Sequence, residues 1–364
     1  LYTLLGGIEA VIWTDAIQSI ILTIGAILVV GLILTDMPGG AGNAISIASE
    51  AGKFKLGEFN SLSLADSTVW VVLMYGIFIN LTNFGIDQNF VQRYHAADSE
   101  KAAGRSVWMG SLMYMPVALM FFFIGSILFS YYQANPDLLE EVKITKATEL
   151  LAEQSYESAK SSDEKMAKIK LMARELEPDK YGDKILPHFI ANQMPAGLAG
   201  MLIAALFAAA MSSIDTSLNS SSTITLQDFY RRWLNPHASE AQSLRFLRIM
   251  TVLFGLIGTS LALAMMGVKS ILDVWWKISG VFAGGMLGLF LLGFICRRAN
   301  NAGAAIGATI GVLVILWMTF SPAMKDDLGW MSSPFHANMI TVIGTLSIFL
   351  FGLTASWFFN SKRG

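Results

Sequence analysis

Charged residues and cysteine are both scarce in this 364-residue sequence. Asp, Glu, Lys and Arg together make up only 14% of it, and no basic domain is visible, which argues against a nucleic acid partner. The single cysteine, Cys296, excludes an intramolecular disulfide and any metal site made of several cysteines. The four histidines lie at or beyond the edges of apolar segments, and there is no HExxH motif or nucleophile elbow. We therefore do not expect an enzyme.

Apolar residues take the place of the missing charge. They account for 54% of the chain, which is above the range of soluble proteins. Segments long enough to cross the hydrocarbon core of a membrane recur along the sequence. We predict an all-α polytopic membrane protein with about eight transmembrane helices. They are expected at Ile8–Leu34, Val69–Val91, Ser106–Tyr132, Pro195 to about Trp233, Leu244–Met266, Ile271–Phe294, Ala304–Phe320 and Met339–Phe359.

The chain begins inside an apolar run. Leu1 to Leu5 resemble the end of a helix, and we expect Gly6 and Gly7 to interrupt it. There is no initiator Met and no positively charged leader. We therefore expect the chain to be a fragment that lacks the N-terminal helices of a longer protein.

A polar stripe runs along the segment Ala199–Thr225. Its members recur at steps of three and four residues and so share one face of a helix: Ser212, Asp215, Thr216, Asn219 and Ser222 or Thr223. Polar groups at membrane depth are costly unless they face protein, water or an ion. Small residues and hydroxyls also join packed helices, which is the competing interpretation. The carboxylate favours an ion pathway, and oxygen ligands suit a hard cation.

Two other spans carry polar groups at membrane depth. Asp15 lies about two turns into the first span and is a candidate functional carboxylate, with a helix cap as the alternative. The segment Ile79–Gln88 combines Asn, Thr, Gly, Asp and Gln where hydrocarbon is expected. This composition predicts an interrupted helix of the kind that builds substrate sites in transporters. An intact helix with a polar packing face is the alternative interpretation.

Charge is concentrated in one insertion. Pro136–Lys184 holds 21 of the 52 charged residues, which predicts two solvated helices outside the membrane. Among the short loops, those on the side of the two chain ends hold eleven Lys and Arg, against five on the other side. Because positive loops favour the cytoplasm, we predict that both ends are cytoplasmic and that the insertion is outside.

Four motifs occur in order along the chain: AVIWTDAIQ, NFGIDQNFVQRYHAADSEKA, AALFAAAMSSIDTSLNSSSTITLQDFY and FLLGFICRRANNAGAAIG. In them the sequence resembles the solute:sodium symporter family, which includes sodium/glucose and sodium/sialic acid cotransporters. The resemblance covers nearly the whole chain except the charged insertion. It implies part of a LeuT-type inverted-repeat fold, with the second repeat complete. The implied parts are core helix five (1–34), an extracellular loop (35–68), core helices six and seven (69–132), the charged extracellular insertion (133–194), core helices eight to ten (195–296) and two peripheral helices (297–364).

The resemblance also implies ion ligands. The family's principal sodium site falls on the carbonyl of Ala209 and the hydroxyls of Ser212 and Ser213, and its other ligands would come from the absent first core helix. A second sodium site, found in some members, falls on three further positions: Asp15, Asp215 and Thr216. An Asp at 215 departs from the commoner Ser or Thr, and it could bind a second cation or exchange a proton. Arg93 matches an arginine at the inner gate and could pair with Asp15 after the ion leaves.

Substrate and gate positions follow in the same way: Asn80, Asn83, Phe84, Asp87, Gln88 and Trp276. Asn80 matches a substrate-contacting Asn of the sugar transporters. Their stacking Tyr is replaced by Asn83 and their Gln by Trp276, so glucose or galactose is not the expected substrate.

We therefore predict a sodium-coupled symporter of the cell membrane that imports a small organic solute by alternating access. The solute class is sugar, sialic acid or monocarboxylate, and the partners are the solute, Na+ and the lipid bilayer. A membrane sensor or signalling module that keeps this fold without transport is the alternative.

Overall fold

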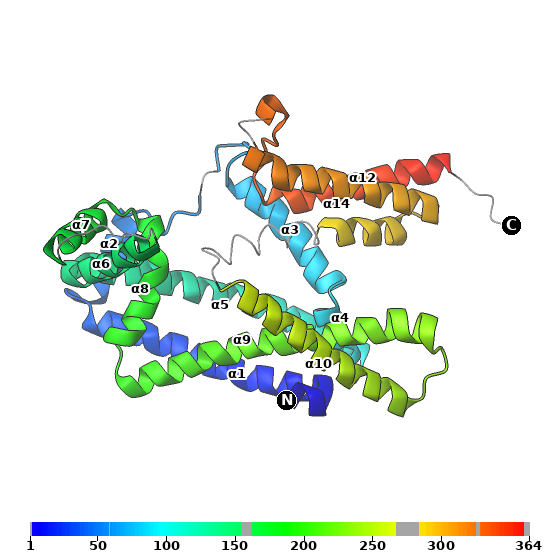
Figure 1. Ribbon diagram of the computed structural model, residues 1–364, viewed down its shortest axis with the longest axis horizontal. Coiled ribbons are helices and arrows are strands. Elements are labelled where there is room, and N and C mark those ends of the chain that lie inside the picture. The colour runs from blue at the N-terminus through cyan, green and yellow to red at the C-terminus, as the bar shows by residue number, and fades with distance from the viewer. Residues whose placement is uncertain (1, 58, 154–161, 267–283, 325–327, 360–364) are drawn as a thin grey trace. The chain divides into compact units, whose positions relative to one another are not determined.

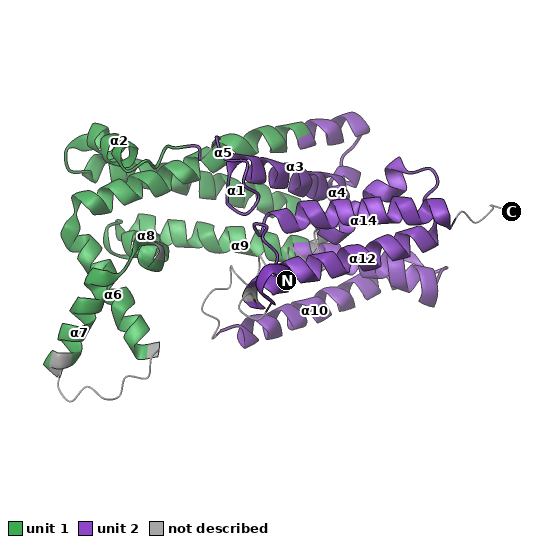
Figure 2. Ribbon diagram, turned by 90° about the horizontal axis from the view of Figure 1, so that it is seen from above, with its two compact units in different colours: residues 1–55, 108–216 green, residues 56–107, 217–364 purple. Residues whose placement is uncertain are grey.

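The computed structural model describes residues 2–57, 59–153, 162–266, 284–324 and 328–359 (Figure 1). Throughout these ranges the chain forms helices joined by turns, and they contain no strand. Two compact units result, one from residues 1–55 and 108–216 and the other from residues 56–107 and 217–364 (Figure 2). The all-α prediction is confirmed.

Six helices of the described part are long and apolar enough to cross a membrane, and one bent pair makes a seventh span. They are α1 (Tyr2–Asp36), α5 (Glu100–Ala134), α9 (Ala196–Ile224) with the π-helix η1 (Thr225–Leu234), α10 (Glu240–Ala264), α12 (Asn301–Phe320), α14 (Met339–Phe358) and the bent pair α3 (Val69–Gly85) and α4 (Gln88–His95). Seven of the eight predicted spans are thus present as helices. The other, Ile271–Phe294, lies mostly outside the described residues, and its end is seen as the apolar helix Gly284–Ile295.

The predicted break at Gly6 and Gly7 is wrong, because α1 continues through both residues. In hydrocarbon, a broken helix leaves backbone groups without hydrogen bonds, which costs several kcal/mol per group. Glycine in a helix costs only about 1 kcal/mol relative to alanine. An uninterrupted helix is therefore the lower-energy choice in an apolar segment.

The first unit is built around one apolar core formed by α1, α5, α8 (Pro178–Asn192) and the beginning of α9. Its most deeply buried members include Ile33, Ile127 and Phe189, none more than 1% exposed. The short helix α2 (Gly40–Glu50) is fixed to α5 because the buried Ser130 hydroxyl donates to the carbonyl of Ala44 at 2.7 Å.

In its described residues the charged insertion forms helices, as predicted, but three rather than two: α6 (Pro136–Glu153), α7 (Ser162–Glu175) and α8. α6 and α7 share a small apolar core that includes Leu151 and Ile169. Lys184 on α8 forms an ion pair with Glu149 on α6 at 3.0 Å. Some of these charges therefore link helices, which periodicity within one helix does not reveal.

The second unit contains a tightly packed pair, α12 and α14, with α3 against it. Val71, Ile315 and Ile348 are fully buried in this core. The Thr345 hydroxyl donates to the carbonyl of Gly284 at 3.1 Å, which joins α14 to the helix Gly284–Ile295. Two short 3-10 helices, η2 (Ser321–Met324) and η3 (Gly329–Met331), lie in the connection from α12 to α14.

Candidate ion and substrate site

The polar stripe of α9 lies on a helix that runs from Ala196 through η1 to Leu234, as expected. Thr216, Ser220 and Ser222 are buried, with 7%, 5% and 1% of their surface exposed. Ser212 and Asp215 are half-buried, whereas Ser213 is exposed. The stripe therefore enters the protein interior at its C-terminal end and is more open near the candidate sodium ligands.

At the candidate principal site, the hydroxyl of Ser213 donates to the carbonyl of Ala209, and the two oxygens are 3.4 Å apart. Oxygen ligands around a cation of the size of Ca2+ lie at about 2.3–2.6 Å, so neighbouring ligands of an octahedral shell are roughly 3.3–3.7 Å apart. Na+ is similar in size. Ala209 and Ser213 can therefore supply one edge of a coordination shell without moving. Ser212, one residue before Ser213, also accepts a hydrogen bond through its carbonyl, from the Thr216 hydroxyl at 2.9 Å.

The residues of the candidate second site come from α1 and α9, which run in opposite directions (Figure 1). The two helices are close at Gly25, where an added methyl group would lie 3.0 Å from Leu202 Cδ1. From that contact, a rise of 1.5 Å per residue places Asp15 about 15 Å and Asp215 about 20 Å away, towards the same end. The two carboxylates thus lie at similar depth. The buried Thr216 follows Asp215 directly.

The predicted interruption in the second span is confirmed. α3 ends at Gly85, α4 begins at Gln88, and the two helices are bent by 44°. The amides of Ile86 and Asp87 both donate to the carbonyl of Thr82, each at 3.0 Å, which ends α3. The Asp87 side chain then accepts a hydrogen bond from the amide of Asn89 at 2.7 Å and caps α4. A substrate or gate residue was predicted at Asp87, and its role in the structure is to start the next helix.

Aromatic residues close the break. The Tyr94 hydroxyl donates to the carbonyl of Phe84 at 3.1 Å and so satisfies a carbonyl near the end of α3. The rings of Phe84 and Phe90 meet across the bend, with centroids 5.1 Å apart. Asn80 is exposed and donates through Nδ2 to the carbonyl of Gly76 at 2.7 Å, which directs the amide along α3.

Two other predicted positions near the break, Asn83 and Gln88, are half-buried. The remaining one, Trp276, lies outside the described residues. The structure thus places five of the six predicted substrate positions on the two sides of one bend.

A clamp between α4 and the polar helix was not predicted. Gln92 donates through Nε2 to the Ser220 hydroxyl at 2.7 Å and accepts through Oε1 from the Asn219 amide at 3.2 Å. These bonds join the segment after the break to the C-terminal half of the stripe. Arg93, the predicted inner-gate residue, is half-buried next to Gln92 in the last turn of α4.

Comparison with known proteins gives this geometry a context. The sequence profile of the sodium:solute symporter family matches residues 1–153 and 173–311. The chain belongs to the sodium:solute symporter family. The gap between the two matched ranges, residues 154–172, lies within the charged insertion. It is shorter than the whole insertion, which the resemblance in the sequence motifs did not cover.

Two bacterial members of the family match nearly the whole chain. The sodium/sialic acid symporter NanT of Aliivibrio fischeri is 34% identical over 99% of this chain and 62% of its own length. SiaT of Proteus mirabilis, also a sodium/sialic acid symporter, is 32% identical over 100% of this chain and 64% of its own length. The chain therefore spans less than two thirds of these relatives.

A solved structure shares the fold. It is the substrate-bound, outward-open state of a Na+-coupled sialic acid symporter, with 28% identity and a TM-score of 0.74. The match covers 98% of this chain and 64% of that one. The chain thus has the LeuT-type architecture of this family over its described length, and it is a multi-pass membrane protein.

Proposed function

We propose that the protein to which this chain belongs is a sodium-coupled symporter that imports a small organic solute by alternating access. The observation that carries this proposal is the oxygen pair on α9, with the Ala209 carbonyl and the Ser213 hydroxyl 3.4 Å apart, in a member of a sodium symporter family. Oxygen ligands without thiolate or imidazole suit Na+ and disfavour a soft metal. Ala209, Ser212 and Ser213 would hold the principal sodium ion.

A second cation would bind closer to the cytoplasm. Asp15, Asp215 and Thr216 come from neighbouring helices and lie at similar depth, which supports a shared station on the exit path. Arg93, in the last turn of α4, would act at the inner gate. In this arrangement the protein lies in the cell membrane with both ends of this chain cytoplasmic.

The solute would carry a carboxylate, and sialic acid is the first candidate. Relatives are named for sialic acid and for monocarboxylates, which have that group in common. Asn80, Asn83 and Gln88 offer amide donors around the bend, and Phe84 offers an apolar wall. Because the Asp87 carboxylate already occupies the N-terminus of α4, we do not assign the solute carboxylate to that helix end.

The coupling would be thermodynamic. Each sodium ion that crosses a potential of 100 mV supplies about 2.3 kcal/mol. This energy corresponds to roughly a 50-fold accumulation of a solute for each net charge moved. Sodium can direct the cycle only by binding one conformation more tightly than the other. Ligands from α9 alone would not give that difference, so a partner element must approach the Ala209–Ser213 edge in one state and leave it in the other.

Uptake by the intact protein in proteoliposomes tests the proposal. Radiolabelled sialic acid, and separately a short monocarboxylate, would be offered under an inward Na+ gradient and under an equal K+ gradient. We expect accumulation of at least one of them with Na+ only. Solute binding without flux under both gradients would instead favour a non-transporting membrane sensor.

A further inference from the structure

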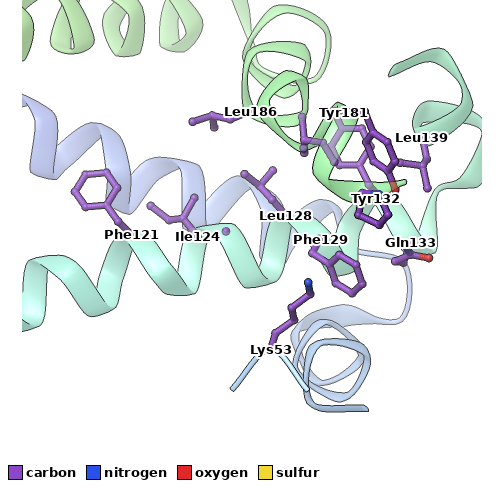
Figure 3. Close-up of a pocket in the computed structure, with 14 residues that line it drawn as sticks. Lys53, Phe121, Ile124, Leu128, Phe129, Tyr132, Gln133, Leu139, Tyr181 and Leu186 are labelled. Atoms are coloured by element: carbon purple, nitrogen blue, oxygen red, sulfur yellow. The ribbon is translucent and has the colours of Figure 1, made fainter. Parts of the chain in front are cut away.

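A cavity of about 320 Å³ lies in the first unit, between the C-terminal half of α5 and the charged insertion, mainly its helix α8. The side chains of α5 form one wall and those of α8 another, and Lys53 reaches in from the turn after α2 (Figure 3). Its walls are mainly apolar, from Phe121, Ile124 and Leu128 to Leu186. None of the described candidate ion or solute residues lines it.

The cavity has the length of a lipid chain. Its lining follows α5 from Phe121 to Gln133, about 18 Å at a rise of 1.5 Å per residue, of which about 12 Å lies between Phe121 and Phe129, the ring beside Lys53. A smaller cavity of about 40 Å³ shares Phe121, Ile124 and Leu186 with it and extends the apolar lining onto α1 and α9. One leaflet of a bilayer contributes roughly 15 Å of hydrocarbon. An apolar slot of this length along a transmembrane helix fits one acyl chain.

The side chain of Lys53 places a positive charge at this slot. The ammonium of Lys53 lies 4.3 Å from the centroid of the Phe129 ring, a cation–π contact. No carboxylate of the described residues is within ion-pairing distance of it. The backbone holds Lys53 in place, because Gly52 has φ of +69° and the Lys53 amide donates to the carbonyl of Ala48 at 2.9 Å, as in a Schellman motif. The Ser130–Ala44 hydrogen bond ties that helix to α5.

We propose that this cavity binds a phospholipid with an anionic headgroup. The phosphate lies against Lys53, and one acyl chain follows α5 towards Phe121. Charge complementarity selects the headgroup, and the length of the slot selects a chain in place of a compact solute. In the orientation proposed above, the lipid comes from the outer leaflet. Only this choice of leaflet depends on that orientation, and the binding site does not depend on transport.

Two pairs of variants separate the acyl chain from the headgroup. Gly125 lines the cavity, and an added Cβ there would meet no atom within 4 Å. The first side-chain carbon of Gly125→Leu therefore meets open space, and the rest of the leucine side chain is expected to occupy part of the slot. Gly110 lies on the same helix with equally open surroundings and does not line the cavity, so Gly110→Leu is its control. Lys53→Gln removes the charge, and Lys55→Gln is the matched control outside the cavity.

Native mass spectrometry of the intact protein in detergent measures the binding. The probes are dioleoyl phosphatidylglycerol, dioleoyl phosphatidylcholine and soluble glycerol 3-phosphate. Both lipids carry a phosphate, but the choline ammonium of phosphatidylcholine offsets its negative charge. We therefore expect phosphatidylglycerol to bind about fivefold more tightly, the effect of one uncompensated charge about 4 Å from Lys53 in water. Lys53→Gln should abolish that preference. Gly125→Leu should weaken the binding of both lipids by a similar factor. The control variants Gly110→Leu and Lys55→Gln should bind both lipids like the wild type.

Three results would overturn the proposal. Equal lipid binding by the two leucine variants would show that the slot holds no acyl chain. Equal affinity for the two lipids would remove the role of Lys53. Binding of glycerol 3-phosphate as tightly as phosphatidylglycerol would make the site one for a soluble phosphate. Circular dichroism shows whether Gly125→Leu has folded, and Lys53→Gln tests the headgroup independently of it.

Discussion

Replacing Gly307 by alanine should push α12 and α14 apart. Gly303, Gly307 and Gly311 recur at four-residue steps on α12 and face α14. A Cβ at Gly307 would lie 2.6 Å from the Cα of Gly352, 2.7 Å from its nitrogen and 2.7 Å from the carbonyl oxygen of Ile348. All three are backbone atoms, so no side-chain rotation can relieve the clash. The helices themselves must move.

The size of the effect follows from those distances. Ordinary contacts of a Cβ begin at 3.4 Å, so the nearest atoms are at least about 0.7 Å too close. Extra atoms forced into a well-packed core typically cost about 1–3 kcal/mol. Alanine also gains up to about 1 kcal/mol over glycine in a helix, which hides part of this cost. A second glycine-to-alanine variant, at a helical position without a clash, measures that gain so that it can be subtracted.

Gly255→Ala supplies that reference. Gly255 lies within α10, and an added Cβ there would meet nothing within 4 Å. Thermal or denaturant unfolding of the two variants in detergent should show Gly307→Ala to be less stable by about 1–3 kcal/mol, the steric cost alone. Equal stability of the two variants would refute the close approach of α12 and α14.

Three further predictions concern the candidate site. Ser213→Ala should strongly impair sodium activation of uptake, because one oxygen of the proposed principal site is lost; wild-type sodium dependence in the transport assay would contradict the assignment. Asp215→Asn should lower sodium affinity or the sodium:solute ratio, and measurements that leave both unchanged would rule out the second station. Gln92→Leu should reduce stability by about 1 kcal/mol, since it removes two interhelical hydrogen bonds of about 0.6 kcal/mol each. Gln92→Glu keeps acceptors for both partners, so an equal loss in an unfolding assay would show that the bonds to Asn219 and Ser220 are not the cause.

The sequence predicted the features that follow from the membrane itself. Spans such as Met339–Phe359 are apolar over the full thickness of the hydrocarbon, so their helical state follows from composition. The break near Gly85 was predicted because several weak helix formers stand together there, and α3 does end at that residue. The polar stripe of α9 depends only on helical periodicity and on the absence of a breaker.

Contacts between distant segments were beyond the reach of sequence patterns. Gln92 binds side chains more than 120 positions away, and nothing in its own neighbourhood marks it as different from Gln88. The same holds for Lys53 and Phe129, which meet only because α2 packs on α5. A polar residue on one span and a polar stripe on another, such as Gln92 and the stripe of α9, are only a weak indication that the two form hydrogen bonds. No sequence pattern predicted that Thr225–Leu234 would be π-helical. In the structure, the ring of Tyr230 in this segment stacks on that of Phe246, with the ring centroids 4.2 Å apart.

The charge of the solute determines what a second sodium ion contributes. A monoanion that enters with one Na+ carries no net charge, so the membrane potential adds nothing and only the sodium concentration gradient drives uptake. With two Na+ the cycle moves one positive charge, and 100 mV then supplies about 2.3 kcal/mol. The hydroxyls of Ser212 and Ser213 are neutral and cannot balance the charge of an ion. The carboxylates of Asp15 and Asp215, which lie at similar depth, can balance the charge of a second sodium ion. If Asp215 is the reason that the second ion binds, uptake of an anionic solute should depend on voltage in the wild type and lose that dependence in Asp215→Asn, while the sodium gradient still drives both.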